Sequence, residues 1–64
     1  MSYYTVKEVQ KILGISSSKA YQVIRQLNGE LKAKGFITIA GKVSKKFFNE
    51  RYYASDDDIK QAIG

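Results

Sequence analysis

The side chains with the most specific chemistry follow Ser16 along one predicted helix. Gln22 and Arg25 lie three residues apart, so they share one face of that helix. A glutamine amide pairs bidentately with adenine and an arginine guanidinium with guanine, and each good pair contributes about 1–3 kcal/mol of discrimination between bases. Serine hydroxyls and free N–H groups at the start of a helix suit phosphates. The residues predicted to contact nucleic acid from this helix are Ser17, Ser18, Lys19, Tyr21, Gln22 and Arg25.

A second group of candidate residues is purely basic. Lys42, Lys45 and Lys46 lie close together in the sequence, and lysines add affinity for phosphates without reading bases. The chain carries a net charge of +5, and residues 1–54 hold ten of its eleven Lys and Arg against three Glu. This balance favours a polyanionic partner. The alternatives are solvated surface charge for the lysines and a place at the edge of the core for Tyr21.

The residues that catalysis or metal binding would need are missing from the sequence. It has no His and no Cys, and its serines have no base beside them. Its six acids include the run Asp56–Asp58, whose consecutive side chains diverge and which lacks the glycine and spaced acids of a calcium loop. We therefore predict no enzymatic activity, no catalytic residue, no metal and no cofactor.

Two helices joined by Gly14-Ile15-Ser16 are expected to position the first group. The segment 5–13 begins with a capping-box pattern, Thr5 with Glu8, and ends at Gly14. Ser16 then caps a second helix. Its apolar stripe is Ala20, Val23, Ile24, Leu27 and Leu31. Asn28-Gly29 either breaks this helix as a turn or lies within it, and because Leu31 stays in phase we favour a continuous helix to about Lys34.

The remainder of the chain predicts a small wing and a short helix. Residues 36–39 and 42–43 are expected to form a β-hairpin around Ala40-Gly41, with Ile37 and Ile39 buried. Ser44 is expected to cap a helix that runs to about Tyr53, with Phe47 and Phe48 in the core. Residues 55–64 form an acidic tail that is either a docked final helix or a frayed end. Its acids suit a helix start, and a partner-binding role is the alternative.

Together these elements predict an α+β fold that is mostly α: a winged helix-turn-helix with a two-stranded wing and a short C-terminal helix. The predicted domain covers residues 1–54, and residues 55–64 are the tail. The sequence has no long apolar run and no signal-peptide pattern. We therefore expect a cytoplasmic protein without a membrane partner.

The segment TVKEVQKILGISSSKAYQVIRQLN, followed by a predicted hairpin and the basic KVSKKFF, resembles the excisionase-type branch of the MerR-like winged helix-turn-helix proteins. The resemblance covers residues 3–53. It implies a small protein of phages and integrative elements that binds DNA near an attachment site, often on repeats, bends it and directs an integrase toward excision. This sequence departs from the family pattern at Gln10, where a small residue is usual, and at Ser44, where a proline commonly precedes the basic helix.

The resemblance leaves several roles open. The leading prediction is sequence-specific binding of double-stranded DNA in the service of an integrase or recombinase. Many members also act as small transcriptional regulators, which is the first alternative. A protein-interaction module, such as an anti-repressor, is the second, although its surface should be apolar or acidic. The protein either binds cooperatively as a monomer on repeats or forms a weak dimer through residues such as Lys32 or Phe36.

Overall fold

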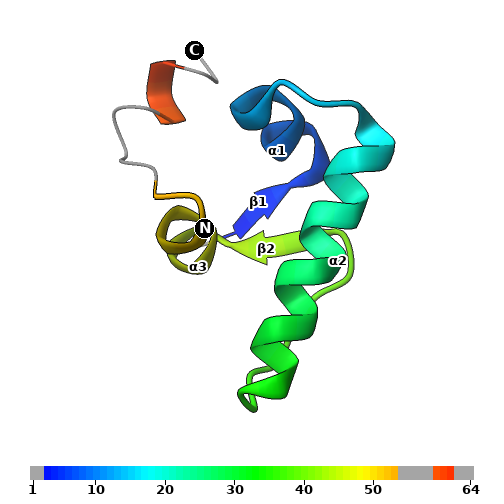
Figure 1. Ribbon diagram of the computed structural model, residues 1–64, viewed down its shortest axis with the longest axis vertical. Coiled ribbons are helices and arrows are strands. Elements are labelled where there is room, and N and C mark those ends of the chain that lie inside the picture. Colours follow the sequence, from blue (N-terminus) through cyan, green and yellow to red (C-terminus); the bar gives the residue numbers. More distant parts are fainter. Residues whose placement is uncertain (1–2, 54–58, 62–64) are drawn as a thin grey trace.

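The computed structural model describes residues 3–53 and 59–61 of the 64-residue chain. Along the chain the elements are β1 (Tyr3–Thr5), α1 (Val6–Leu13), α2 (Ser17–Ala33), β2 (Lys42–Ser44) and α3 (Lys45–Arg51), followed by a turn of helix at residues 59–61 (Figure 1). The strands form one two-stranded antiparallel sheet. The prediction of a mostly helical domain with a two-stranded sheet is therefore confirmed.

The ends of α1 are set by its own sequence, as predicted. Thr5 Oγ1 accepts a hydrogen bond from the Glu8 amide at 3.3 Å, and Glu8 Oε1 accepts one from the Thr5 amide at 2.9 Å. These bonds satisfy backbone donors that have no partner inside a helix. Gly14 ends the helix with φ at +65°, a left-handed conformation that a residue with a Cβ resists.

The helix α2 is continuous, as the phase of Leu31 indicated. Ser16 Oγ accepts from the Lys19 amide at 3.3 Å to begin it, and the helix runs through Asn28 and Gly29 to Ala33. Its buried residues are Ala20, Ile24, Leu27 and Asn28. The sequence did not predict that Asn28 would lie on the buried face. The hydrogen-bond partners of Asn28 lie in the part of the chain that follows α2.

Of the predicted hairpin of residues 36–39 and 42–43, only the turn around Ala40-Gly41 is confirmed, and the pairing of the two segments as strands is wrong. The strand β2 pairs with β1, with Tyr4 opposite Val43, and the segment 36–41 contributes a single bridge, Ile39 with Lys42. Ile37 and Ile39 were expected in the core, but they are 92% and 45% exposed. Pairing β1 with β2 places Tyr4 and Val43 in the interior together, so a small core is filled without the two isoleucines.

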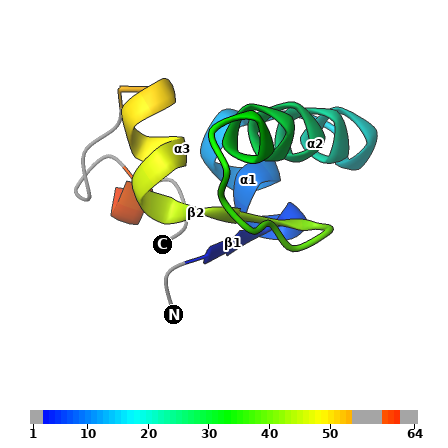
Figure 2. The same ribbon diagram turned by 90° about the horizontal axis from the view of Figure 1, so that it is seen from below.

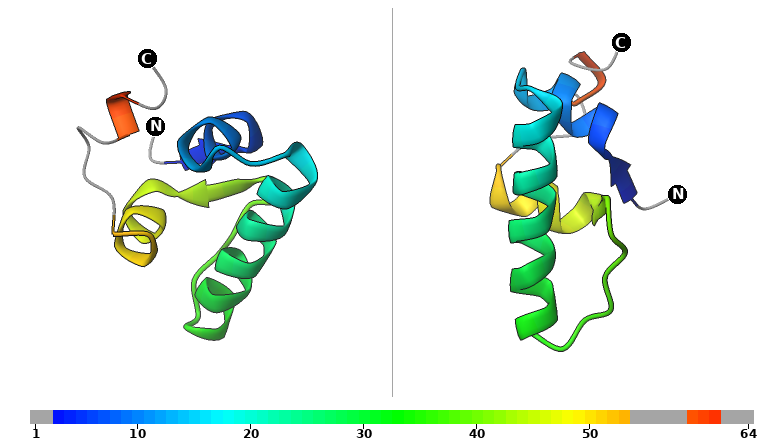
Figure 3. Two further views of the ribbon diagram at one scale, coloured as in Figure 1. Left: turned by 45° about the horizontal axis from the view of Figure 1, so that its top comes forward. Right: turned by 90° about the vertical axis from the view of Figure 1, so that its right-hand side faces the viewer.

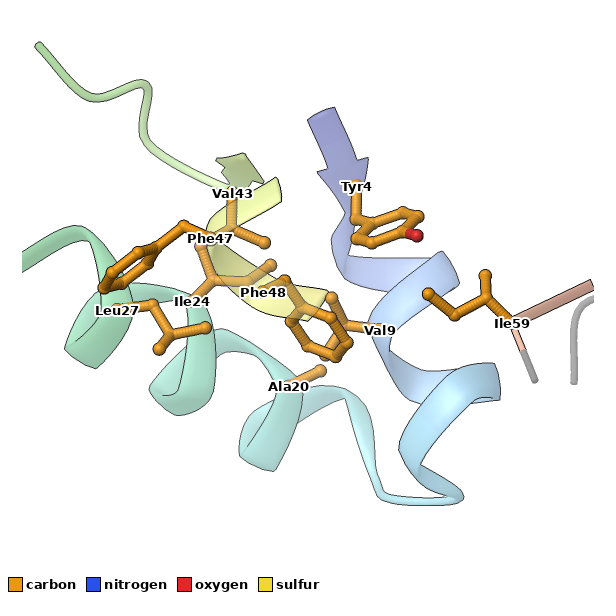
Figure 4. Close-up of a cluster of buried hydrophobic side chains, with 9 residues drawn as sticks. All are labelled: Tyr4, Val9, Ala20, Ile24, Leu27, Val43, Phe47, Phe48 and Ile59. Carbon is orange, nitrogen blue, oxygen red and sulfur yellow. The ribbon is translucent and has the colours of Figure 1, made fainter. Parts of the chain in front are cut away.

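The core lies between α1, α2, the sheet and α3. Phe48 is at its centre, with its ring edge-on to Tyr4 at 5.3 Å between centroids and stacked on Tyr52 at 4.8 Å. Figure 4 shows the buried cluster, which consists of Tyr4, Val9, Ala20, Ile24, Leu27, Val43, Phe47, Phe48 and Ile59. The predicted burial of Phe47 and Phe48 is confirmed. Ile59 brings part of the tail into the core beside α1, whereas the acids Asp56–Asp58, predicted to suit a helix start, lie outside the described residues.

The helix α3 is fastened at its start and along its side. Ser44 Oγ accepts from the Phe47 amide at 3.3 Å, so serine caps the helix as predicted. Arg51 then donates to both carboxylate oxygens of Glu30 on α2, at 2.7 and 2.9 Å. Figure 2 shows α3 on one flank of α2, with the strands crossing beneath the helices. The segment 36–41 begins on the α3 side, where Phe36 and Ile37 share a hollow with Phe47, and reaches the other flank of α2 at the turn of residues 39–42.

Candidate nucleic-acid interface

The predicted contact residues of α2 lie on its exposed side. Ser17, Ser18, Lys19, Gln22 and Arg25 are all exposed, because they fall out of phase with the buried stripe of the helix. Tyr21 is 54% exposed, so it is a surface residue and not part of the core. The helix α2 runs the length of one side of the molecule and leaves this face open to a large partner (Figures 1 and 3).

One groove gathers part of the predicted set. It has a volume of about 600 Å³ and lies between α2 and the residues 38–41. Tyr21 and Arg25 are on its helical wall, and the segment 36–41 runs beside α2 on this side (Figure 3, right). The other lining residues are Ile24, Asn28, Gly29, Lys32, Thr38, Ala40 and Gly41. Lys19 lies two residues before Tyr21, so its side chain leaves the helix on the opposite flank.

The three predicted basic residues after α2 lie in three different settings. Lys42 is exposed at the start of β2, next to the turn that bounds the groove. The ammonium of Lys45 lies over the ring of Tyr4, 5.3 Å from its centroid, as a cation–π contact. Lys46 lines a separate hollow of about 440 Å³ beside Phe36 and Ile37. Their closeness in sequence therefore does not place them in one pocket.

Asn28 is a residue of this region that the sequence analysis missed. It is 8% exposed, and its Nδ2 donates to the carbonyls of Ile39 and Lys42 at 3.1 and 2.9 Å. These two residues bridge to each other across the turn, so one side chain attaches the turn to α2. The available signal was its position four residues after Ile24, which places it on the buried face of the helix.

The two flanks of α2 differ in the charges that they carry. Its only acid, Glu30, faces α3, where the guanidinium of Arg51 lowers the pKa of the Glu30 carboxyl and Glu30 in turn raises the pKa of Arg51. The residues that line the groove include Arg25 and Lys32 and no acid. The exposed face of α2 and the groove therefore present hydroxyl, amide and cationic groups to a partner.

Other kinds of site are not found in the described part of the chain. No group of His, Cys, Asp or Glu in residues 3–53 and 59–61 could hold a metal ion. None of the helices described there is both long and apolar enough to cross a membrane. Within the described residues, the exposed surface of α2 and its groove are therefore the candidate site.

The chain belongs to the excisionases of integrative elements, which are not enzymes. The relative that shows this is the ICEBs1 excisionase of Bacillus subtilis (strain 168), which is 44% identical over 50 residues that make up 78% of each chain. The family resemblance and the absence of enzymatic activity predicted from the sequence are thereby confirmed. No protein-family model and no solved structure matches the chain.

Proposed function

We propose that this protein is a winged helix-turn-helix factor that binds double-stranded DNA near an attachment site, bends it and assists an integrase in excision. Membership of the excisionase family, together with the exposed and acid-free face of α2, supports the proposal. In this proposal α1 and α2 are the helix-turn-helix, and the turn at residues 39–42 is the tip of the wing. DNA is the partner, the cytoplasm is the compartment, and the integrase is the second protein.

The recognition helix would enter the major groove by its N-terminal half. A major groove about 12 Å wide admits one helix, and the exposed side of α2 carries the groups that read base edges. Gln22 and Arg25 would contact bases, and Tyr21 would lie against them at the rim of the groove. Ser17, Ser18 and Lys19 would contact phosphates around the start of the helix.

The lysines after α2 would supply affinity without sequence preference. Lys42 is next to the turn and Lys46 is exposed, so both are accessible to phosphates. Lys45 is half-buried against Tyr4, and we therefore expect it to contribute less to phosphate binding than Lys42 and Lys46. Each phosphate contact adds about one unit to the slope of log affinity against log salt.

Titration of the protein into duplexes from the DNA that flanks its own gene tests this function. Random duplex is the control, and each titration is run at about 50 and about 200 mM salt, where phosphate contacts weaken strongly. We expect tight, stepwise and salt-sensitive binding that exceeds binding to random DNA. Several steps on one fragment, with bending of the DNA, support the excisionase role and cooperative monomers. One or two sites at a promoter indicate a transcriptional regulator, and no binding to either duplex indicates an anti-repressor that binds protein.

The assignment of base-reading and phosphate-binding residues is tested by two substitutions. Arg25→Ala should remove about 1–3 kcal/mol of discrimination at one base position and leave binding to random duplex little changed. Lys46→Ala should weaken specific and random duplex to the same extent, because a phosphate contact carries no sequence information. Equal losses on both duplexes for Arg25→Ala would remove that residue from the base-reading set.

A further inference from the structure

We propose that the groove between α2 and residues 38–41 holds one sugar–phosphate strand of the DNA, with Gly29 as the point of closest approach and Lys32 as the bound cation. This inference rests on the proposed function and extends it. It assigns a role to two residues of α2 that lie beyond the predicted contact set.

No contact within the described part of the protein requires a glycine at position 29. It lies inside α2, where glycine costs about 1 kcal/mol relative to alanine. A Cβ built at this position meets nothing within 4 Å, and Gly29 does not have the left-handed φ of Gly14 or Gly41. Neither packing nor backbone conformation therefore requires it. A missing side chain on an exposed helix wall is useful when another backbone must come close to it.

The charges around Gly29 indicate what that other backbone is. Arg25 lies four residues before Gly29 and Lys32 three residues after it, so both cations flank the bare position on one helix face. Neither forms an ion pair with another residue that the structure describes. The groove has no acidic lining residue. A polyanionic strand fits this wall, whereas a neutral or basic peptide finds no complementary charge in an acid-free cationic groove.

The opposite wall of the groove is equally bare. It is formed by Thr38, Ala40 and Gly41, and a Cβ at Gly41 also meets nothing within 4 Å. Asn28 joins the two walls at the base of the groove. Its hydrogen bonds to the Ile39 and Lys42 carbonyls set the distance between the walls. Two small-residue walls held at a fixed distance can admit a chain between them.

The geometry of duplex DNA supplies the reason for such a groove. The major groove and the next minor groove are separated by one sugar–phosphate strand. A protein that places a helix in one groove and a turn in the next must therefore pass that strand between the helix and the turn. Among the residues that the structure describes, the groove over Gly29 lies between α2 and the turn, so the strand runs there and Lys32 binds a phosphate.

Substitutions at Gly29 test the close approach, because stability and binding should change in opposite directions. Gly29→Ala should raise the midpoint of thermal unfolding, since alanine favours a helix and meets no atom. The same substitution should weaken binding to the flanking-DNA duplex, and Gly29→Gln should weaken it further, by about tenfold, comparable with one mismatched base pair. Ala33→Gln is the matched control, because Ala33 is exposed on α2 but does not line the groove. It should leave affinity unchanged.

A pair of lysine substitutions tests the phosphate contact. Lys32→Ala should reduce the slope of log affinity against log salt by about one unit, the amount expected for one lost phosphate. Lys34→Ala removes the same charge two residues away, from a side chain that lies over the Phe47 ring and outside the groove. It should leave the slope unchanged. If both variants reduce the slope equally, the effect is one of net charge and the groove is not the phosphate site.

The outcomes separate this inference from the function on which it rests. If the unsubstituted protein does not bind duplex DNA, the proposed function fails. If it binds, and Gly29→Gln binds as tightly while keeping its fold, then no strand lies over Gly29 and only the inference is overturned. Higher stability with lower affinity for Gly29→Ala, no loss for Ala33→Gln and a reduced slope for Lys32→Ala alone support it.

Discussion

The two flanks of α2 are built in different ways. On the flank toward α3, aromatic rings fill the interior, Tyr52 stacks on Phe48, and Arg51 donates from Nε and Nη2 to the two carboxylate oxygens of Glu30. On the other flank, the single residue Asn28 holds the turn of residues 39–42 by two backbone carbonyls, and Ile39 remains exposed. Buried apolar area is the main interaction on the α3 flank, whereas hydrogen bonds hold the turn on the other flank.

This difference indicates that the two flanks have different roles. Packed aromatic side chains contribute most of the stability of so small a domain, because disulfides are excluded by the absence of Cys. A turn held by hydrogen bonds contributes little buried apolar area, but its position relative to α2 is defined. The α3 flank therefore stabilises the fold, and the other flank sets the shape of the surface that meets the partner. Three predictions test this contrast.

The largest effect is expected from Phe48→Ala. Phe48 is fully buried at the centre of the core, and truncating such a ring costs about 3–5 kcal/mol. That amount equals the whole stability expected for a domain of this size, so the variant should be largely unfolded at 25 °C. Circular dichroism during urea titration measures this. Tyr53→Ala, at a residue that is 95% exposed, is the control and should unfold like the parent.

A smaller and more local effect is expected from Asn28→Ala. Removing the amide leaves two carbonyls without their side-chain donor, at a cost of about 1–3 kcal/mol. The backbone amide signals of residues 38–42 in an NMR spectrum should shift, while those of α3 should not. Affinity for DNA should fall, because the turn is no longer fixed. Ala33→Gln, at an exposed position of α2 that lines neither flank, is the control. Equal shifts in α3 would show that the two flanks are not independent.

The smallest effect is expected at the ion pair of the α3 flank. Arg51 and Glu30 are 46% and 31% exposed, and exposed pairs of this kind contribute little. Arg51 lowers the pKa of Glu30 from its ordinary value of 4.5, so the stabilisation is present above that value and is lost as the pH falls through the lowered pKa.

Glu30→Gln measures that contribution. The variant should be slightly less stable than the parent at pH 7, and the difference should vanish in strong acid, where the parent carboxyl is protonated as well. Urea titrations at both pH values provide the comparison. Glu50→Gln is the control, because Glu50 is exposed and forms no ion pair within the described residues. A difference that persists unchanged in acid would assign the effect to packing and not to charge.

The sequence predicted those parts of the molecule that local interactions determine. Thr5 with Glu8, Gly14, Ser16 and Ser44 mark helix ends, and each was assigned correctly because capping involves residues only a few positions apart. The exposure of the α2 contact face followed from the 3.6-residue period. The family could be assigned because the motif combines several of these local signals.

The parts that failed depend on residues far apart in the chain. The strand β1 is only three residues long, so periodicity could not reveal it, and its partner β2 lies about forty residues later. Without β1, the apolar segment 36–39 was the only available partner for β2, and Ile37 and Ile39 were assigned to the core. The role of Asn28 could not be predicted, because the carbonyls that it binds belong to a turn whose place is set by that same strand pairing.

The pairing of β1 with β2 also determines when the domain can fold. Because β1 is synthesised near the beginning of this segment and β2 follows α2, a nascent chain that ends at residue 35 contains both long helices but cannot close the sheet. Phe47 and Phe48 are then missing as well, so the apolar stripe of α2 is covered only in part, by α1, until α3 has left the ribosome. Folding during synthesis should therefore be a single late event and not a stepwise build-up of helices, which a series of stalled nascent chains can resolve.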